Sequence, residues 1–209
     1  VQDLAASLPD RLLGAGCGRR VLDLAAAPGG KSLQLAAAGW DVTALDASPR
    51  RLERLADNLA RTGLAARMVC ADARDWQPAA AFDAILVDAP CTATGTCRRH
   101  PDVLHRIGPA QIAQMAELQA ALLARAAGWL APGGRLVYAV CSLEPEEGEQ
   151  VAQGCPLAPA PIAAAELPAG LAPGADGRVR TDPGMLPEAG GLDGFFIARW
   201  HKGLSPVEG

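Results

Sequence analysis

The feature of this sequence that most constrains its fold is a regular alternation of short apolar runs with helical patterns. The apolar runs have the length and composition of β-strands, and they cover residues 20–24, 41–45, 67–71, 82–87 and 135–140. Helical patterns lie between them, at residues 31–38, 48–62 and 109–130. Strands that alternate with helices in this way predict an α/β fold with an open, parallel, doubly wound sheet.

The last quarter of the chain has a different composition. Residues 152–177 are dominated by Ala, Pro and Gly and show no clear periodicity. Two short runs within residues 178–200 flank a Pro/Gly-rich turn, and they predict a C-terminal hairpin at the sheet edge. A length of 209 residues suits one domain, so we expect a single domain over 1–209 with a lead-in helix in residues 1–18.

Charge and cysteine content limit the classes of function. The formal net charge of −4 argues against a strongly basic, free-standing nucleic-acid binder. No window approaches eighteen uninterrupted apolar residues, so we expect no membrane span. Six cysteines without a visible secretory signal predict reduced thiols and a cytoplasmic location. None of them shows C-x2-C spacing, and we expect no metal site.

A loop of small residues follows the first predicted strand. It consists of Ala25, Ala26, Ala27, Pro28, Gly29, Gly30 and Lys31. Ligands of a doubly wound sheet bind beyond the carboxyl ends of the strands, where small residues let the backbone approach a ligand closely. The loop lacks the first glycine of a phosphate-binding P-loop, and the G-x-G-x-x-G spacing is absent. It therefore fits a cofactor without phosphates better than ATP or NAD.

An aspartate follows each of the next three strands, at Asp46, Asp72 and Asp88. An acid after the second strand can accept hydrogen bonds from both ribose hydroxyls of an adenosine, and an acid beyond the third can meet the adenine amino group. One such aspartate is more typical of a cap or a solvated loop, but three at successive strand ends indicate a ligand site. The pattern suits S-adenosylmethionine, whose positive sulfonium tolerates nearby acids.

Two cysteines also follow predicted strands. Cys91 comes after the fourth strand and Cys141 after the fifth, and these strands are neighbours in sheets of this type, so both sulfurs can face one cleft. A free cysteine is most often a small buried hydrophobe, and we keep that interpretation for the other four. They are Cys17, Cys70, Cys97 and Cys155.

The motifs around these cysteines resemble a known family. Residues 88–95 (DAPCTATG) and 140–142 (VCS) are similar to the two cysteine motifs of RNA (cytosine-5)-methyltransferases, and residues 26–32 match that family's cofactor motif. Residues 99–102 (RHPD) and 193–196 (DGFF) match further motifs, as does the pair Gln2-Asp3. Within the family, the resemblance is to the catalytic domain of the bacterial 16S rRNA enzymes of the Fmu/Sun type, and it covers nearly the whole chain.

The resemblance implies a Rossmann-like, mostly parallel sheet of seven strands and S-adenosylmethionine as cofactor. It also implies methyl transfer to carbon 5 of a cytosine in RNA, with 16S rRNA as the expected substrate. It assigns the attack on carbon 6 to Cys141, which makes carbon 5 nucleophilic. It gives Cys91 a part in releasing the carbon-5 proton, while Asp88 binds the N3 and N4 edge of the base. Lys31 contacts either the cofactor or the cytosine carbonyl. DNA cytosine methyltransferases attack with the cysteine after the fourth strand, so Cys141 favours RNA.

Full-length relatives carry an N-terminal RNA-binding region, and we expect this chain to lack it. A basic cluster between the two cysteine motifs is the expected RNA contact, formed by Arg98, Arg99, His105 and Arg106. Two other functions stay open at this point. One is a methyltransferase for a small molecule or protein, in which both cysteines are structural. The other is a non-catalytic module that binds S-adenosylmethionine.

Overall fold

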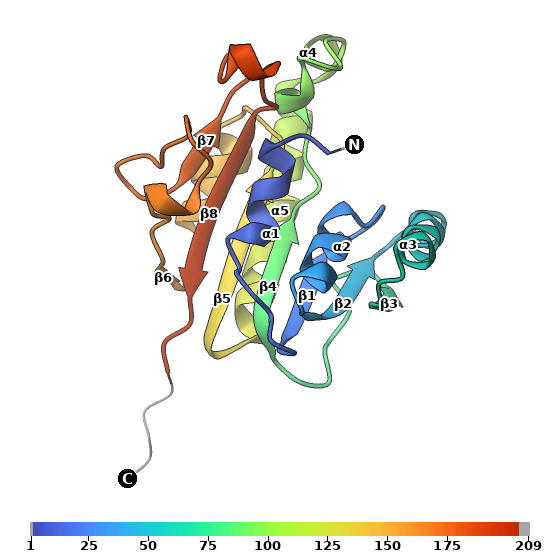
Figure 1. Ribbon diagram of the computed structural model, residues 1–209. Coiled ribbons are helices and arrows are strands. Elements are labelled where there is room, and N and C mark those ends of the chain that lie inside the picture. The colour runs from blue at the N-terminus through green and yellow to red at the C-terminus, as the bar shows by residue number, and fades with distance from the viewer. Residues whose placement is uncertain (1, 205–209) are drawn as a thin grey trace.

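The computed structural model describes residues 2–204, which form one eight-stranded sheet with helices on both faces (Figure 1). The strand order is β3-β2-β1-β4-β5-β8-β6, and β7 pairs with β8. The first five strands are parallel, whereas β8 runs antiparallel to β5, β6 and β7. The strands are β1 (Arg20–Leu24), β2 (Asp41–Asp46), β3 (Arg67–Cys70), β4 (Phe82–Asp88), β5 (Leu130–Val140), β6 (Ala158–Pro159), β7 (Val179–Thr181) and β8 (Phe195–His201).

The doubly wound, mostly parallel sheet predicted from the sequence is confirmed, with one correction. The sheet has eight strands rather than seven, because Ala158–Pro159 adds the short strand β6 beside β8. The surrounding Ala/Pro/Gly-rich segment has no apolar alternation, so nothing in its pattern marks this strand. The chain winds outward from β1 to β3, returns to β4 beside β1, and continues to β5. This reversal between β1 and β4 is the point where doubly wound sheets bind ligands.

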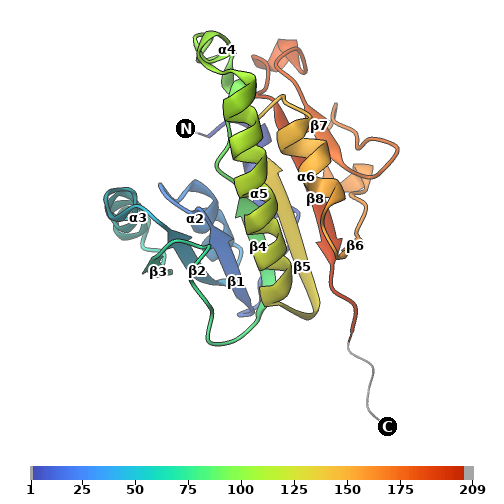
Figure 2. The ribbon, with the colours of Figure 1, turned by 180° about the vertical axis from the view of Figure 1, so that it is seen from behind.

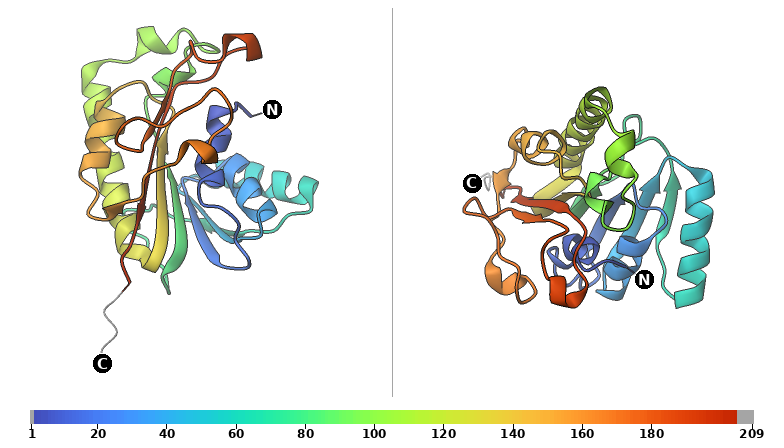
Figure 3. Two further views of the ribbon diagram at one scale, coloured as in Figure 1. Left: turned by 60° about the vertical axis from the view of Figure 1, so that its left-hand side comes forward. Right: turned by 90° about the horizontal axis from the view of Figure 1, so that it is seen from above.

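Helices cover both faces of the sheet, which gives three layers (Figure 3). Helices α1 and α2 lie on one face, and α5 and α6 lie on the other (Figure 2). The helices are α1 (Leu8–Arg11), α2 (Gly30–Ala37), α3 (Pro49–Thr62), α4 (Val103–Arg106), α5 (Pro109–Trp129) and α6 (Val151–Gln153). Short helical turns are η1 (Ala5–Ser7), η2 (Thr94–Thr96), η3 (Glu146–Gln150, a π turn), η4 (Ala164–Glu166) and η5 (Pro187–Ala189).

Strand β4 joins the two halves of the core. Ile85 and Val87 pack with α5 on one face, and Leu86 packs with the cluster under α1 and α2 on the other. All three side chains are completely buried, because both faces of this central strand are covered. The carboxyl end of β4 is therefore held in a fixed position relative to its neighbours.

The lead-in helix predicted for residues 1–18 is confined to the short elements η1 and α1. Gly14 and Gly18 follow at φ +76°, a left-handed conformation that ends helices and favours glycine. No helix within residues 2–204 is long and apolar enough to cross a membrane.

Candidate active site

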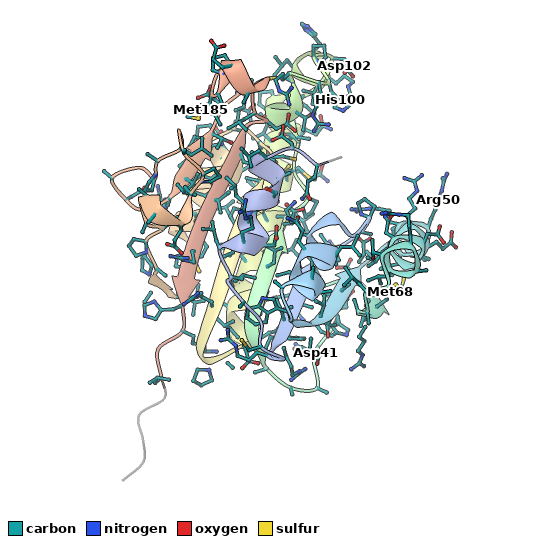
Figure 4. The ribbon with its side chains drawn as sticks, in the orientation of Figure 1. Asp41, Arg50, Met68, His100, Asp102 and Met185 are labelled. Atoms are coloured by element: carbon teal, nitrogen blue, oxygen red, sulfur yellow. The ribbon has the colours of Figure 1, made fainter. Side chains whose placement is uncertain are left out.

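The predicted site lies where the parallel strands end beside β1 and β4. Asp41, at the amino end of β2, lies at the opposite end of the sheet (Figure 4). The small-residue loop leaves β1 at Ala25, which has φ +66°, and enters α2 after Gly29, at φ +105°. A Cβ at Gly29 would overlap with the side chain of Leu55 on α3. Only glycine therefore lets this loop lie directly against α3.

One cavity of about 270 Å³ opens beside the ends of β1, β2 and β3. Its wall is mainly apolar, with Leu45, Leu118 and Leu122 among its lining side chains. Three of the predicted cofactor residues also line it, namely Ala25, Asp46 and Asp72. A cavity of this size is near the lower end of ligand pockets, which begin at about 300 Å³.

The two aspartates of this cavity have different environments. Asp46 is 3% exposed, and its carboxylate accepts the N–H groups of Ala27 at 3.1 Å and Ser48 at 2.9 Å. It thereby ties the small-residue loop to the start of α3. Asp72 is more open and pairs with Arg74 at 2.6 Å; hydrogen bonds from Arg74 lower the pKa of Asp72 to about 2. The Asp72 carboxylate is thus an available acceptor, whereas Asp46 is already partly engaged by backbone N–H groups.

A second cavity, of about 740 Å³, opens on the other side of the loop. The predicted cofactor residues that line this cavity are Ala26, Ala27, Pro28, Gly30, Lys31 and Asp88. Gly29 lines neither cavity. The Lys31 ammonium lies 2.8 Å from the Asp88 carboxylate and 5.7 Å from the ring centre of Phe195. Burial opposes the charge on Lys31, but Asp88 outweighs it, so the pKa of Lys31 is raised. The loop therefore separates two cavities, and Lys31 and Asp88 belong to the second.

The two cysteines meet at the same end of the sheet. Cys91 and Cys141 follow β4 and β5, which are paired in parallel up to Asp88 and Ala139, and their Sγ atoms are 3.4 Å apart. The hydrogen bond from Cys91 lowers the pKa of the Cys141 thiol, and Lys31 lowers it further. The same hydrogen bond and burial raise the pKa of Cys91. The pair therefore loses its first proton from Cys141, which makes this sulfur the better nucleophile.

The predicted basic cluster does not consist of free charges. Arg98 pairs with Asp3 at 2.8 Å, and the Arg99 Nε donates to both oxygens of Asp193 at 3.1 Å. Asp193 is 1% exposed, so these contacts tie the Cys91 loop to the segment before β8. The other two predicted residues lie on α4, where Arg106 pairs with Asp102 and His105 is exposed. Side chains of this region point outward at the top of the molecule, as the labelled His100 and Asp102 show (Figure 4).

Sequence reasoning missed Glu147, which is completely buried beneath both cysteine loops. Its carboxylate accepts hydrogen bonds from Thr92 and Ser142, the residues that follow Cys91 and Cys141. Glu147 stands in a run of acids, 144–149, whose pattern is typical of a solvated surface. No sequence signal distinguishes it from its exposed neighbour Glu146. Within residues 2–204, His, Cys, Asp and Glu side chains form no group of three that could hold a metal ion.

Comparisons with known proteins give a consistent family. Residues 12–201 match the family model described as 16S rRNA methyltransferase RsmB/F. The chain is 40% identical to ribosomal RNA small subunit methyltransferase B of Vibrio vulnificus and 44% identical to the protein of that name in Klebsiella pneumoniae. These matches cover 95% and 97% of this chain but 46% of each relative. The chain thus spans about half the length of these relatives.

Solved structures with the same fold include two archaeal proteins. NSun6 from Pyrococcus horikoshii, solved with SFG, has a TM-score of 0.79 and 31% identity, and the match covers 96% of this chain and 52% of that one. A methyltransferase homolog protein from Pyrococcus horikoshii has a TM-score of 0.76 and 31% identity, with 96% and 67% covered.

Proposed function

Because the chain belongs to the RsmB/F family of 16S rRNA methyltransferases, we propose that it methylates carbon 5 of a cytosine in RNA, with small-subunit rRNA as substrate. The observation that carries this proposal is the pair of thiols at the ends of β4 and β5, with 3.4 Å between the sulfurs of Cys91 and Cys141. Two thiols with opposite pKa perturbations suit a reaction that needs one nucleophile and one proton carrier.

The cofactor in this proposal is S-adenosylmethionine, and the residues that line the first cavity suit its adenosine part. Asp46 and Asp72 line an apolar cavity at the ends of β2 and β3, where they can accept from ribose hydroxyls and an adenine amino group. The small-residue loop lies between this cavity and Asp88, so a bound molecule can extend along the loop. When bound, S-adenosylmethionine supplies an electrophilic methyl group. The carboxylates favour its positive charge.

The chain's own residues supply the remaining chemistry. The Cys141 thiolate adds to carbon 6 of the cytosine, which turns carbon 5 into an enamine-like nucleophile. Asp88 and Lys31 line the second cavity together, which favours contact of both with the base: Asp88 at the N3 and N4 edge, and Lys31 at the carbonyl oxygen. After methylation, the carbon-5 proton passes to Cys91, once this thiol has given up its own proton, or to a water molecule that Cys91 holds; the electrons of the carbon–hydrogen bond re-form the carbon 5–carbon 6 double bond, and the Cys141 thiolate leaves.

RNA contact in this proposal involves the surface around the Cys91 loop. Arg98 and Arg99 keep part of their guanidinium groups exposed beside their aspartate partners, and His105 and Arg106 extend the surface along α4. The target base must be unstacked to reach Cys141, as in other base-modifying enzymes. We place further RNA-binding determinants in the part of the longer relatives that this chain does not span. Since the two relatives described above are bacterial and are named as ribosomal RNA methyltransferases, we propose the cytoplasm as the location of the reaction.

The test uses a Cys91→Ala variant with S-adenosylmethionine and cytosine-containing rRNA. Without the release residue, the bond between Cys141 and the base should persist, and a denaturing gel should show protein attached to RNA. The band should vanish in a Cys91→Ala/Cys141→Ala variant, and Cys97→Ala should give no persistent band. If Cys91→Ala binds the cofactor and the RNA but forms no attached species, the proposed reaction is wrong.

A further inference from the structure

The buried Glu147 carboxylate joins the residues that directly follow the two cysteines. One oxygen accepts the backbone N–H of Thr92 at 2.9 Å. The other accepts the hydroxyl of Ser142 at 2.5 Å and also the hydroxyl of Thr92. Thr92 follows Cys91 and Ser142 follows Cys141, so one carboxylate holds both cysteine loops at adjacent residues.

A second contact fixes the other side of Cys91. The side-chain amide of Gln119, on α5, donates to Glu147 at 2.9 Å and to the carbonyl of Pro90 at 2.8 Å. Pro90 precedes Cys91, so the residues on both sides of this cysteine are linked to one buried network. We call Glu147, Thr92, Ser142 and Gln119 the Glu147 clamp. Its four side chains are each at most 7% exposed.

Burying the polar groups of the Glu147 clamp costs desolvation free energy that apolar packing would avoid. A buried carboxylate must be hydrogen-bonded, and the four donors here are neutral groups, so no cation compensates the charge through them. Such a network is rigid when its hydrogen bonds are satisfied, as those of both Glu147 oxygens are; within residues 2–204 the side-chain oxygen of Gln119 is buried without a partner. The Glu147 oxygens accept from groups on both loops, a geometry that an apolar side chain of similar volume cannot reproduce.

Other contacts also join the two loops. The N–H of Gly95 donates to the carbonyl of Cys141 at 3.1 Å, and the N–H of Leu143 donates to the Thr94 hydroxyl at 2.9 Å. Neither contact involves Thr92, the residue that follows Cys91. Glu147 is the side chain that binds the residue directly after each cysteine. Its negative charge also contributes to keeping the proton on Cys91.

We propose that Glu147 is a positioning residue that sets the separation of the Cys91 and Cys141 sulfurs by clamping the two loops together. The catalytic part of this inference rests on the function proposed above, but the sulfur separation does not. A displacement of about 1 Å at a reacting group can lower the rate about 100-fold. We therefore expect Glu147→Ala to reduce methyl transfer on that order.

The first experiment measures sulfur separation without RNA or cofactor. Phenylarsine oxide bridges two neighbouring thiols through arsenic and releases water, so it is captured only by a close pair. The wild-type chain should capture it stoichiometrically, and Cys91→Ala should not. Glu147→Ala should lose this capture, while its Cys141 still reacts with iodoacetamide. The matched control is Glu146→Ala, which removes an exposed acid from the same turn and should capture the reagent as wild type does.

Glu147→Gln tests whether hydrogen bonding, rather than packing alone, sets the geometry. The glutamine oxygen can still accept from Thr92 and Gln119, and its amide can donate to the two hydroxyls once they rotate. This variant should keep arsenical capture and most of the methyl transfer. If Glu147→Ala fails to fold, Thr92→Val decides the question. This substitution removes the hydroxyl group with which Thr92 donates to Glu147. It should weaken the capture of phenylarsine oxide without reducing the reaction of Cys141 with iodoacetamide.

Two outcomes would overturn the proposal. One is undiminished arsenical capture by folded Glu147→Ala or, if that variant does not fold, by Thr92→Val. The other is loss of capture in Glu147→Gln as severe as in Glu147→Ala. Absence of RNA methylation in the wild-type chain, combined with the predicted differences in capture, would contradict the proposed function while supporting the positioning role of Glu147.

Discussion

The carboxyl group of Asp23 should make the stability of this protein strongly dependent on pH. Asp23 lies in β1 and is completely buried, with one oxygen accepting the Ser32 hydroxyl at 2.5 Å. Its other oxygen is buried without a hydrogen-bond partner within residues 2–204. Burial raises the pKa of Asp23 from 3.8 to about 7, although the Ser32 hydrogen bond opposes the shift.

The sign and size of the effect follow from proton linkage. The folded protein binds the Asp23 proton more tightly than the unfolded chain does, so folding is favoured at low pH. The stabilisation is complete below about pH 4 and is lost as the pH rises to about 7. A pKa difference of about 3 corresponds to about 4 kcal/mol, at 1.36 kcal/mol for each pH unit.

Asp23→Asn should remove the contribution of Asp23 to this pH dependence, while that of Asp10, whose pKa burial also raises to about 7, should remain. Asparagine has the shape of the protonated acid, can accept from Ser32, and does not titrate. Urea unfolding followed by circular dichroism, from about pH 5 to about pH 8, should show a smaller fall in the free energy of unfolding for the variant than for wild type. Asp57→Asn, which changes an exposed acid on α3, should follow the wild-type curve. Equal slopes for Asp23→Asn and wild type would refute the reasoning.

Three further substitutions test separate parts of the structure. Lys31→Met should raise the pKa of Cys141 and slow its alkylation by iodoacetamide at neutral pH about tenfold, since Lys31 favours the thiolate; an unchanged rate would exclude this electrostatic contribution. Gly95→Ala should lower the free energy of unfolding by about 1–3 kcal/mol in urea, because a Cβ would overlap with the carbonyl of Gly194; unchanged stability would disprove this contact. Ser48→Ala removes the N-cap of α3 and should cost about 1 kcal/mol in the same assay with no effect on thiol chemistry, and slower alkylation of Cys141 would contradict that separation.

The elements that the sequence predicts well are those with local signals. Helix α3 begins and ends where Ser48, Pro49 and Gly63 indicate, because capping and a left-handed C-terminal residue act within a few residues. Strand β4 is equally clear, since only burial on both faces explains its apolar run. Strands β4 and β5 place Cys91 and Cys141 at one end of the sheet, so the close approach of the two sulfurs could be predicted.

The features that the sequence does not reveal depend on distant partners. Arg98 and Arg99 suggest a free basic surface, yet Asp193, which binds them, lies more than 90 residues away. Glu147 has the local pattern of a solvated acid, and the packing of α5, α6, β5 and β8 around η3 buries it. The side of the loop on which Lys31 lies is likewise set by the ion pair with Asp88, 57 residues further along the chain.

The most direct test of the central claim uses a short RNA in which the target cytosine carries fluorine at carbon 5. Release of Cys141 requires loss of a proton from carbon 5, and fluorine in place of that hydrogen prevents it. Methyl transfer should therefore leave Cys141 bonded to carbon 6 of the base. Peptide mass spectrometry should then find the methylated base on the peptide that contains Cys141, only when S-adenosylmethionine is present. An adduct on Cys91 would contradict the assigned roles of the two thiols. Methylation of this RNA at another atom, without an adduct, would contradict the mechanism.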